Sequence, residues 1–168
     1  MFLNEEQRTL AHDIGTLLIK RSETVAVSES TTGGLVSAAL LSVGGASKYY
    51  SGGGVVYTLA SRTALLGIPA ERYVDYRGTT PEMLTEIAHA VRERLNTTWG
   101  LAESGLAGPT GGRFGAPAGR TTMSVAGPVA RTEVLETGFT DREINMVEFT
   151  TLTLRFLKLA VQNANEQA

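Results

Sequence analysis

The uneven spacing of glycine is the feature that most restricts how this 168-residue chain can fold. Thirteen of its nineteen glycines gather in three places: Gly33-Gly34, the stretch from 44 to 54, and the run from 105 to 119. Glycine lets backbone N–H groups approach a ligand closely or take positive φ, so such clusters are typical of loops between regular elements. We therefore expect compact helices and strands joined by candidate binding loops, with plain turns as the alternative.

Helical and strand patterns alternate between these glycine clusters. The expected helices cover residues 4–21, 35–41, 61–66, 81–95 and 140–163, and the expected strands cover 24–27, 54–58, 99–106, 121–126 and 132–137. Capping boxes begin the first helix at Asn4 and the last at Thr140. This order predicts one domain over residues 1–168, an α/β fold in the form of a three-layer α/β/α sandwich with a mixed β-sheet and an antiparallel hairpin near Gly127.

Composition excludes several classes of site and partner. The chain has no cysteine and only two histidines, His12 and His89, so we expect neither a cysteine-based nor a histidine-based catalytic site, and no metal. Lysine and arginine number 15 against 17 acidic residues and form no basic run, which argues against nucleic acid as a partner. Apolar stretches stay shorter than the about 18 residues of a membrane span, and we expect a soluble, cytoplasmic protein with no membrane partner.

A hydroxyl-rich segment follows the first predicted strand. Residues 28–34, Ser-Glu-Ser-Thr-Thr-Gly-Gly, would place hydroxyls and free N–H groups at the N-terminus of the helix at 35–41. The partial positive charge of a helix N-terminus favours an anion such as phosphate. The spacing matches neither the Walker nor the dinucleotide-binding pattern, and Ser30 or Thr31 as a simple N-cap is the alternative.

A second candidate loop connects the strands at 99–106 and 121–126. Residues 104–112 read Ser-Gly-Leu-Ala-Gly-Pro-Thr-Gly-Gly, and Pro117-Ala118-Gly119 follows. The stretch from 107 to 119 is longer than an ordinary hairpin connection and carries five glycines and two prolines, which favours a functional loop. A mobile loop without function is the alternative.

These loops also carry a family resemblance. Residues 29–34, Glu-Ser-Thr-Thr-Gly-Gly, resemble the Glu-Ser-Cys-Thr-Gly-Gly signature of the CinA C-terminal domain, with Thr31 in place of the cysteine. Further similar segments follow in the same order as in that family: Gly45-Ala46-Ser47, residues 53–57, residues 104–112 and residues 117–119. The resemblance extends from about residue 8 to about residue 160 and implies a CinA C-terminal-domain-like fold that forms a homo-oligomer.

Active members of this family hydrolyse the amide of nicotinamide mononucleotide by a serine-dependent route that uses no cofactor. The resemblance implies a small phosphorylated nucleotide-like ligand and assigns catalytic positions to Ser30, Ser47, Tyr57 and Arg62. We expect the ligand to be bound by the residues of the two loops: Glu29, Thr31, Thr32, Gly33, Gly34, Ser104, Gly105, Gly108, Pro109, Gly111 and Gly112.

Arg62 is where this chain departs from the family, which has lysine at that position. A guanidinium stays protonated at physiological pH, so Arg62 can bind an anion but cannot accept the proton of a serine. Lys48, Glu29 and Glu103 are the alternative bases; a surface position for Lys48 and pairing of the carboxylates with arginine are the competing interpretations. Two functions stay open: a serine-dependent nicotinamide-nucleotide amidase, and an inactive relative that binds a nucleotide-like ligand.

Overall fold

A computed structural model of the chain describes residues 1–164 and places five helices and five strands in them. In chain order the elements are α1 (Glu5–Arg21), β1 (Val25–Glu29), α2 (Leu35–Leu41), β2 (Tyr50–Val55), α3 (Leu59–Leu66), α4 (Pro81–Leu95), β3 (Trp99–Gly105), β4 (Arg120–Ala126), β5 (Arg131–Glu136) and α5 (Arg142–Asn163). Two short 3₁₀ turns, Ala46–Lys48 and Ala70–Tyr73, precede β2 and α4.

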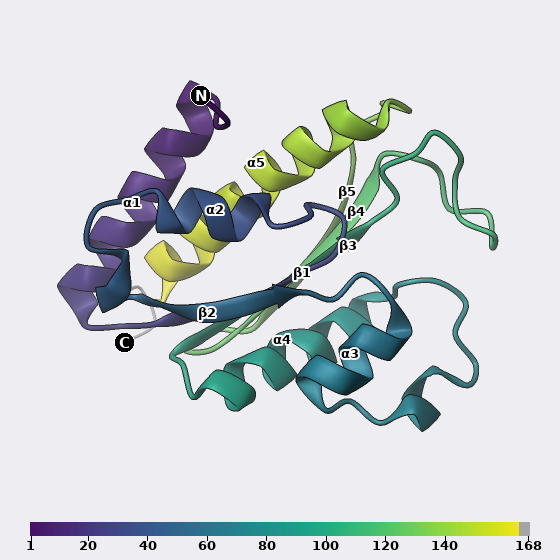
Figure 1. Ribbon diagram of the computed structural model, residues 1–168, viewed down its shortest axis with the longest axis horizontal. Coiled ribbons are helices and arrows are strands. Elements are labelled where there is room, and N and C mark those ends of the chain that lie inside the picture. Colours follow the sequence, from purple (N-terminus) through teal and green to yellow (C-terminus); the bar gives the residue numbers. More distant parts are fainter. Residues whose placement is uncertain (165–168) are drawn as a thin grey trace.

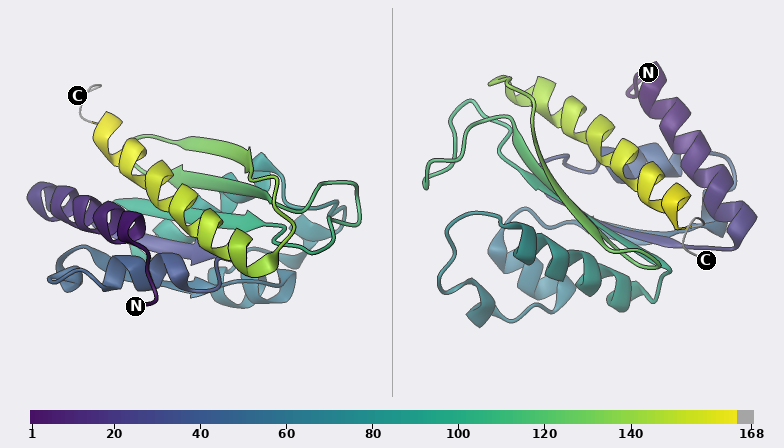
Figure 2. Two further views of the ribbon diagram at one scale, coloured as in Figure 1. Left: turned by 90° about the horizontal axis from the view of Figure 1, so that it is seen from above. Right: turned by 180° about the vertical axis from the view of Figure 1, so that it is seen from behind.

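The five strands form one mixed sheet in the order β2-β1-β3-β4-β5. Strand β1 runs parallel to both β2 and β3, whereas β3, β4 and β5 are antiparallel to one another. Helices α1, α2 and α5 cover one face of the sheet, and α3 and α4 cover the other (Figures 1 and 2). The predicted three-layer sandwich is therefore confirmed, and so is the hairpin near Gly127, which joins β4 to β5.

Apolar side chains fill the space on both faces of the sheet. The larger cluster lies under α1, α2 and α5 and includes Ile14, Leu40, Leu101 and Leu157, which are fully buried. A smaller cluster lies under α4, where Leu84 and neighbouring side chains meet the opposite face of the sheet. Burial of a fully buried side chain of this kind contributes about 1.5–3 kcal/mol, so these two layers hold the sheet in place.

Several element boundaries differ from those expected by one to four residues, and two of the differences have a clear local cause. Strand β2 begins at Tyr50 instead of Gly54, because its glycines belong to the strand and not to a link before it. Glycine is rare in strands, but a Cβ on Gly53 would overlap the carbonyl oxygen of Val27 on β1, so this strand needs glycine to approach its neighbour. At the start of α5 the cap is Asp141, whose carboxylate accepts the N–H of Ile144, and not Thr140.

The parallel pairing of β1 with β3 positions the candidate loops. Val25 pairs with Trp99 and Ser28 with Ala102, so the carboxyl ends of both strands lie at the same edge of the sheet. Ligands of open α/β sheets bind at this edge. In residues 1–164 no helix is long and apolar enough to cross a membrane.

Candidate functional site

The two predicted loops meet at the carboxyl ends of β1 and β3. The hydroxyl of Thr31 donates to the carbonyl oxygen of Gly105 at 2.8 Å and accepts the Gly105 N–H at 2.7 Å. Glu103, on β3, accepts the backbone N–H groups of Ser30 at 3.2 Å and Thr32 at 3.1 Å. These four bonds fix the first loop against the second.

The N-terminus of α2 is filled by a side chain of the protein. The carboxylate of Glu29 accepts the N–H groups of Gly34, Val36 and Ser37 at 2.9–3.1 Å, and the hydroxyls of Thr32 and Ser37 at 2.6 and 2.5 Å. Glu29 is completely buried. The N–H groups that were expected to hold phosphate are therefore bonded to Glu29, and this helix end offers no room for a ligand anion.

A second buried carboxyl group, that of Glu103, lies beside the first. The hydroxyl of Thr32 is 2.6 Å from Glu29 Oε2 and 3.1 Å from Glu103 Oε2, but it has only one proton to donate. Burial raises the pKa of Glu103 above its usual value and the charge of Glu29 raises it further, while the N–H groups of Thr32 and Ser30 act in the opposite direction. Glu103 therefore keeps its proton to higher pH than an exposed glutamate does, and in the protonated form it can donate to Thr32.

Both carboxyl groups serve the loops, and neither pairs with an arginine within the described residues. The expected alternative of ion pairs with Arg62, Arg113 or Arg120 is thus wrong. Neither Glu29 nor Glu103 lines the pocket described next, so neither faces a bound ligand.

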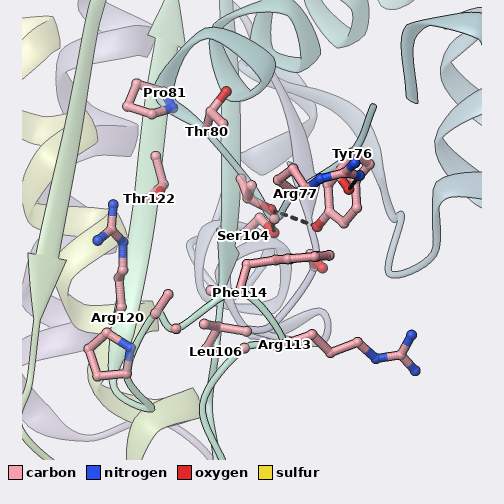
Figure 3. A pocket seen from close by; sticks show the side chains of 18 of the residues that line it. Tyr76, Arg77, Thr80, Pro81, Ser104, Leu106, Arg113, Phe114, Arg120 and Thr122 are labelled. Carbon is pink, nitrogen blue, oxygen red and sulfur yellow. Dashed lines mark hydrogen bonds between the residues drawn. The ribbon is translucent and has the colours of Figure 1, made fainter. Parts of the chain in front are cut away.

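A cavity of about 1010 Å³ opens beside this loop junction. It lies between the end of β3, the long loop after it and the segment that leads into α4 (Figure 3). Its lining includes four arginines, Arg62, Arg77, Arg113 and Arg120, and no Asp or Glu from residues 1–164. Tyr76 and Phe114 add aromatic rings, and the guanidinium of Arg77 lies 5.6 Å from the centre of the Phe114 ring. The pocket therefore combines positive charge with aromatic surface.

Arg62, on α3, is the buried charge of this pocket. Its side chain donates from Nε to the carbonyl oxygen of Val56 at 3.4 Å, from Nη1 to Met83 Sδ at 3.4 Å and from Nη2 to Ser104 Oγ at 3.1 Å. Only 3% of Arg62 is exposed, and no carboxylate of the described chain lies within ion-pair distance. A guanidinium carries five N–H groups, so one on each terminal nitrogen is left without a protein partner.

The structure brings three of the four expected catalytic residues to this pocket. Ser30 and Tyr57 line it together with Arg62, and the hydroxyl of Ser30 has no hydrogen-bond partner in the part of the chain that the structure describes. Tyr57 is exposed, and its hydroxyl accepts from Arg142 Nη2 at 3.0 Å. The side chain of Arg142 also donates to the carbonyl oxygen of Gly108 at 2.9 Å, which ties the rim of the pocket to α5.

Ser47 is the residue that the fold separates from the others. It is exposed and lies in the 3₁₀ turn before β2, whereas Ser30 follows the carboxyl end of β1. Because β1 and β2 are parallel, the two serines lie at opposite ends of the strands, roughly 15 Å apart at about 3.3 Å per residue. Lys48 is exposed beside Ser47, so one chain does not bring this amine to Ser30.

The expected ligand-binding residues divide into two groups. Ser104, Gly105 and Gly112 line the pocket. The residues outside its lining are Glu29, Thr31, Thr32, Gly33, Gly34, Gly108, Pro109 and Gly111. Gly108, at φ +105°, lies where a Cβ would overlap the carbonyl oxygen of Thr140, so the packing of the loop requires this glycine.

Sequence reasoning missed the wall formed by residues 76–81. Tyr76, Arg77 and Thr79 come from the connection between α3 and α4, which has no glycine cluster and matches no binding motif. Their aromatic and cationic side chains just before the Thr80-Pro81 cap were the only available signal. No group of three or more His, Asp or Glu side chains within residues 1–164 could hold a metal ion.

Comparison with known proteins identifies the family. The family model for the CinA C-terminal domain matches residues 7–161. A CinA-like protein of Gloeobacter violaceus is 38% identical over 123 residues, which cover 73% of this chain and 29% of that protein. A CinA-like protein of Desulforapulum autotrophicum is 32% identical over 157 residues, which cover 93% of this chain and 37% of that protein. The chain thus spans about a third of the length of these relatives.

Solved structures agree in fold. A CinA superfamily protein from Klebsiella pneumoniae superposes with a TM-score of 0.87 at 22% identity, over 94% of this chain and 98% of that one. The competence/damage inducible protein CihA from Agrobacterium tumefaciens gives a TM-score of 0.86 at 24% identity, over 96% and 99% of the two chains. From the family match, the sequence identity to CinA-like proteins and the shared fold, this chain belongs to the CinA family, as a CinA C-terminal domain.

Proposed function

We propose that this chain binds a small phosphorylated, nucleotide-like molecule in the pocket beside the β1 and β3 loops. The observation that carries the proposal is Arg62, a guanidinium that is 3% exposed, lines the cavity and has no carboxylate partner within residues 1–164. Burying a charge costs free energy unless a partner compensates it. An anionic ligand supplies that partner and uses the two remaining N–H groups.

The rest of the lining suits the same class of ligand. Arg77 and Arg113 add two positive charges near the opening, which attract a phosphate, and Arg120 adds a third that is partly compensated by Glu136 at 4.0 Å. Tyr76 and Phe114 offer aromatic surface for a planar base or pyridine ring. A phosphate and an aromatic ring in one molecule describe a mononucleotide.

Amide hydrolysis of nicotinamide mononucleotide is the second candidate, and the free hydroxyl of Ser30 in the pocket favours it. A serine needs a base that accepts its proton. Arg62 stays protonated, Glu103 bonds the backbone N–H of Ser30 instead of its hydroxyl, and Lys48 lies at the other end of the strands. Binding without hydrolysis is therefore the function that the geometry supports best.

Calorimetric titration with nicotinamide mononucleotide and with nicotinic acid mononucleotide tests the binding function, and ammonia release from the amide tests hydrolysis. We expect binding of at least one mononucleotide, no ammonia, and binding weakened at least tenfold by Arg62→Gln. Arg72→Gln is the matched control, because Arg72 lies outside the pocket and forms an exposed ion pair with Glu86. Ammonia release by the natural chain would establish the amidase instead, and heats of zero with every mononucleotide would exclude the binding function.

Arg62→Lys is the informative second variant for the catalytic question. Lysine restores an amine that can lose its proton when it is buried. Turnover gained by Arg62→Lys would show that the pocket lacks only a base. Absence of turnover in Arg62→Lys, with binding retained, would show that this chain has also lost other parts of the catalytic machinery.

A further inference from the structure

We propose that the buried floor of the pocket at Arg62 binds a carboxylate and that its exposed rim, formed by Arg77, Arg113 and Arg120, binds a phosphate. The ligand is then an aromatic carboxylic acid mononucleotide and not the corresponding carboxamide. This inference rests on the proposed nucleotide-binding function and specifies the ligand class. It depends on the number of charges at each end of the pocket and on the hydrogen-bonding groups that the floor leaves open.

The charge at the floor is a single positive one. Arg62 is buried there, its protein partners Ser104, Val56 and Met83 are all neutral, and no acidic residue of the described chain lines the cavity. A carboxylate carries one negative charge and neutralises Arg62. A phosphate monoester carries about −1.5 to −2 at neutral pH and would leave excess negative charge in a buried position. The floor therefore matches a carboxylate better than a phosphate.

The open hydrogen-bonding groups at the floor favour an acceptor. Arg62 keeps one N–H on each terminal nitrogen, and two parallel N–H groups are what a planar carboxylate accepts in a bidentate pair. Ser30 also lines the cavity, and a serine hydroxyl can donate a hydrogen bond. A carboxamide has only one oxygen, and its NH₂ group would oppose a guanidinium N–H, donor against donor. Exchange of the carboxylate for an amide thus removes both a charge and a hydrogen bond.

The rim provides a different environment. Arg77 and Arg113 are exposed and Arg120 is partly exposed, so a group bound there keeps contact with water. Figure 3 shows Arg77 with Tyr76 and Phe114 on one side of Ser104 and Arg120 on the other, while the side chain of Arg113 extends away from Ser104. A strongly hydrated dianion fits this rim. The aromatic surface between floor and rim corresponds to the ring that joins a carboxylate to a ribose phosphate.

Nicotinic acid mononucleotide and nicotinamide mononucleotide form a matched pair of probes, because they differ only in carboxylate against carboxamide. We expect calorimetry of the natural chain at neutral pH to give at least tenfold tighter binding of the acid. Arg62→Gln should reduce this preference to about twofold or less, whereas Arg72→Gln should retain it. The ratio in the natural chain needs no variant, so a folding defect of Arg62→Gln would not prevent the test.

The possible outcomes separate this inference from the function on which it rests. Equal affinity for the two nucleotides, or tighter binding of the amide, overturns the carboxylate floor and leaves nucleotide binding intact. Failure of both to bind overturns nucleotide binding itself. A preference for the acid that persists in folded Arg62→Gln would place the selective contact elsewhere and would also overturn the assignment to Arg62.

Discussion

The turn after β1 and the floor of the pocket each bury a charged side chain, but only the turn surrounds its charge with partners. Glu29 accepts five hydrogen bonds from the loop and from α2. Arg62, about as deeply buried, lines a cavity, makes three bonds to neutral groups and leaves two N–H groups without a partner in the described chain. One charge is compensated by the fold, and the other is compensated only when something else binds.

This difference assigns separate roles to two parts of the same edge of the sheet. The Glu29–Gly34 turn was expected to bind phosphate because it places hydroxyls and N–H groups at a helix N-terminus, yet these groups hold a carboxylate of the chain, so its role is to shape the site. At the pocket floor, two N–H groups of Arg62 have no partner in the described chain. The proposed ligand site therefore rests on an uncompensated buried group and not on a glycine-rich pattern.

The largest effect is expected from Glu29→Ala, which would remove the partner of five donors at once. Buried donors left without acceptors cost about 1–3 kcal/mol each, and partial relaxation reduces the sum, so we expect the free energy of unfolding to fall by about 3–5 kcal/mol. Urea unfolding measures this change. The control Glu93→Ala, at an exposed position, should change the free energy of unfolding by less than about 0.5 kcal/mol. A loss below about 1 kcal/mol for Glu29→Ala would mean that the turn does not depend on this carboxylate.

The opposite result is expected for Arg62→Met, which replaces the uncompensated charge with an apolar chain of similar length. Replacement of a buried charge by a well-packed apolar group is often neutral or stabilising, so the free energy of unfolding should stay within about 1 kcal/mol or rise. Nucleotide binding should weaken by about 100-fold, roughly 2.7 kcal/mol. Urea unfolding and calorimetry on the same preparation check both. Destabilisation by more than about 2 kcal/mol would show that Arg62 serves the fold.

Most of the fold could be predicted because periodicity and caps are local signals. The Asn4 capping box and the helix expected over residues 81–95 are both confirmed. Strand β2 was misplaced at its start because its glycines are required by contact with β1, and such a contact between distant segments leaves no periodic pattern.

The site could be predicted only in part. The motifs gave Ser30, Arg62 and Ser104, which line the pocket, because parallel neighbouring strands bring their carboxyl ends together. The roles of Glu29 and of the wall at residues 76–81 depend on which donors and surfaces meet in three dimensions. Ser47 was expected in the site, but the fold places it at the other end of the strands from Ser30. Its position in the sequence does not show this separation.

An intermediate effect is expected at the aromatic wall. Phe114 is 57% exposed and lines the pocket, so Phe114→Ala should leave the free energy of unfolding unchanged and weaken nucleotide binding about fivefold, or about 1 kcal/mol, through lost stacking. Phe139→Ala is the control, because Phe139 is similarly exposed but lies outside the pocket lining. Equal affinity for the two variants would exclude a ring contact at Phe114.

The smallest effect is expected from Glu103→Gln, which should change how the free energy of unfolding depends on pH. Gln retains an acceptor for the N–H groups of Ser30 and Thr32, and its NH₂ can donate to Thr32 as the protonated carboxyl does. Because burial raises the pKa of Glu103 in the folded chain above the value of 4.5 that applies without burial, the folded state binds this proton more tightly than the unfolded state. The natural chain should therefore lose stability relative to Glu103→Gln as pH rises from about 4.5 through the raised pKa, and the difference should be constant above it.

Urea unfolding at a series of pH values tests this expectation, with Glu82→Gln as a control of opposite sign. At the start of α4 the backbone N–H of Glu82 and the Thr80 hydroxyl lower the pKa of Glu82, so the natural chain should lose stability relative to Glu82→Gln as pH falls from about 4.5 through the lowered pKa. Parallel curves for Glu103→Gln and the natural chain would mean that Glu103 is ionised in the fold at the same pH as in the unfolded chain. Two negatively charged carboxylates, those of Glu29 and Glu103, would then share the single Thr32 hydroxyl. The turn would also contain an uncompensated charge, so it would no longer differ from the pocket floor in this respect.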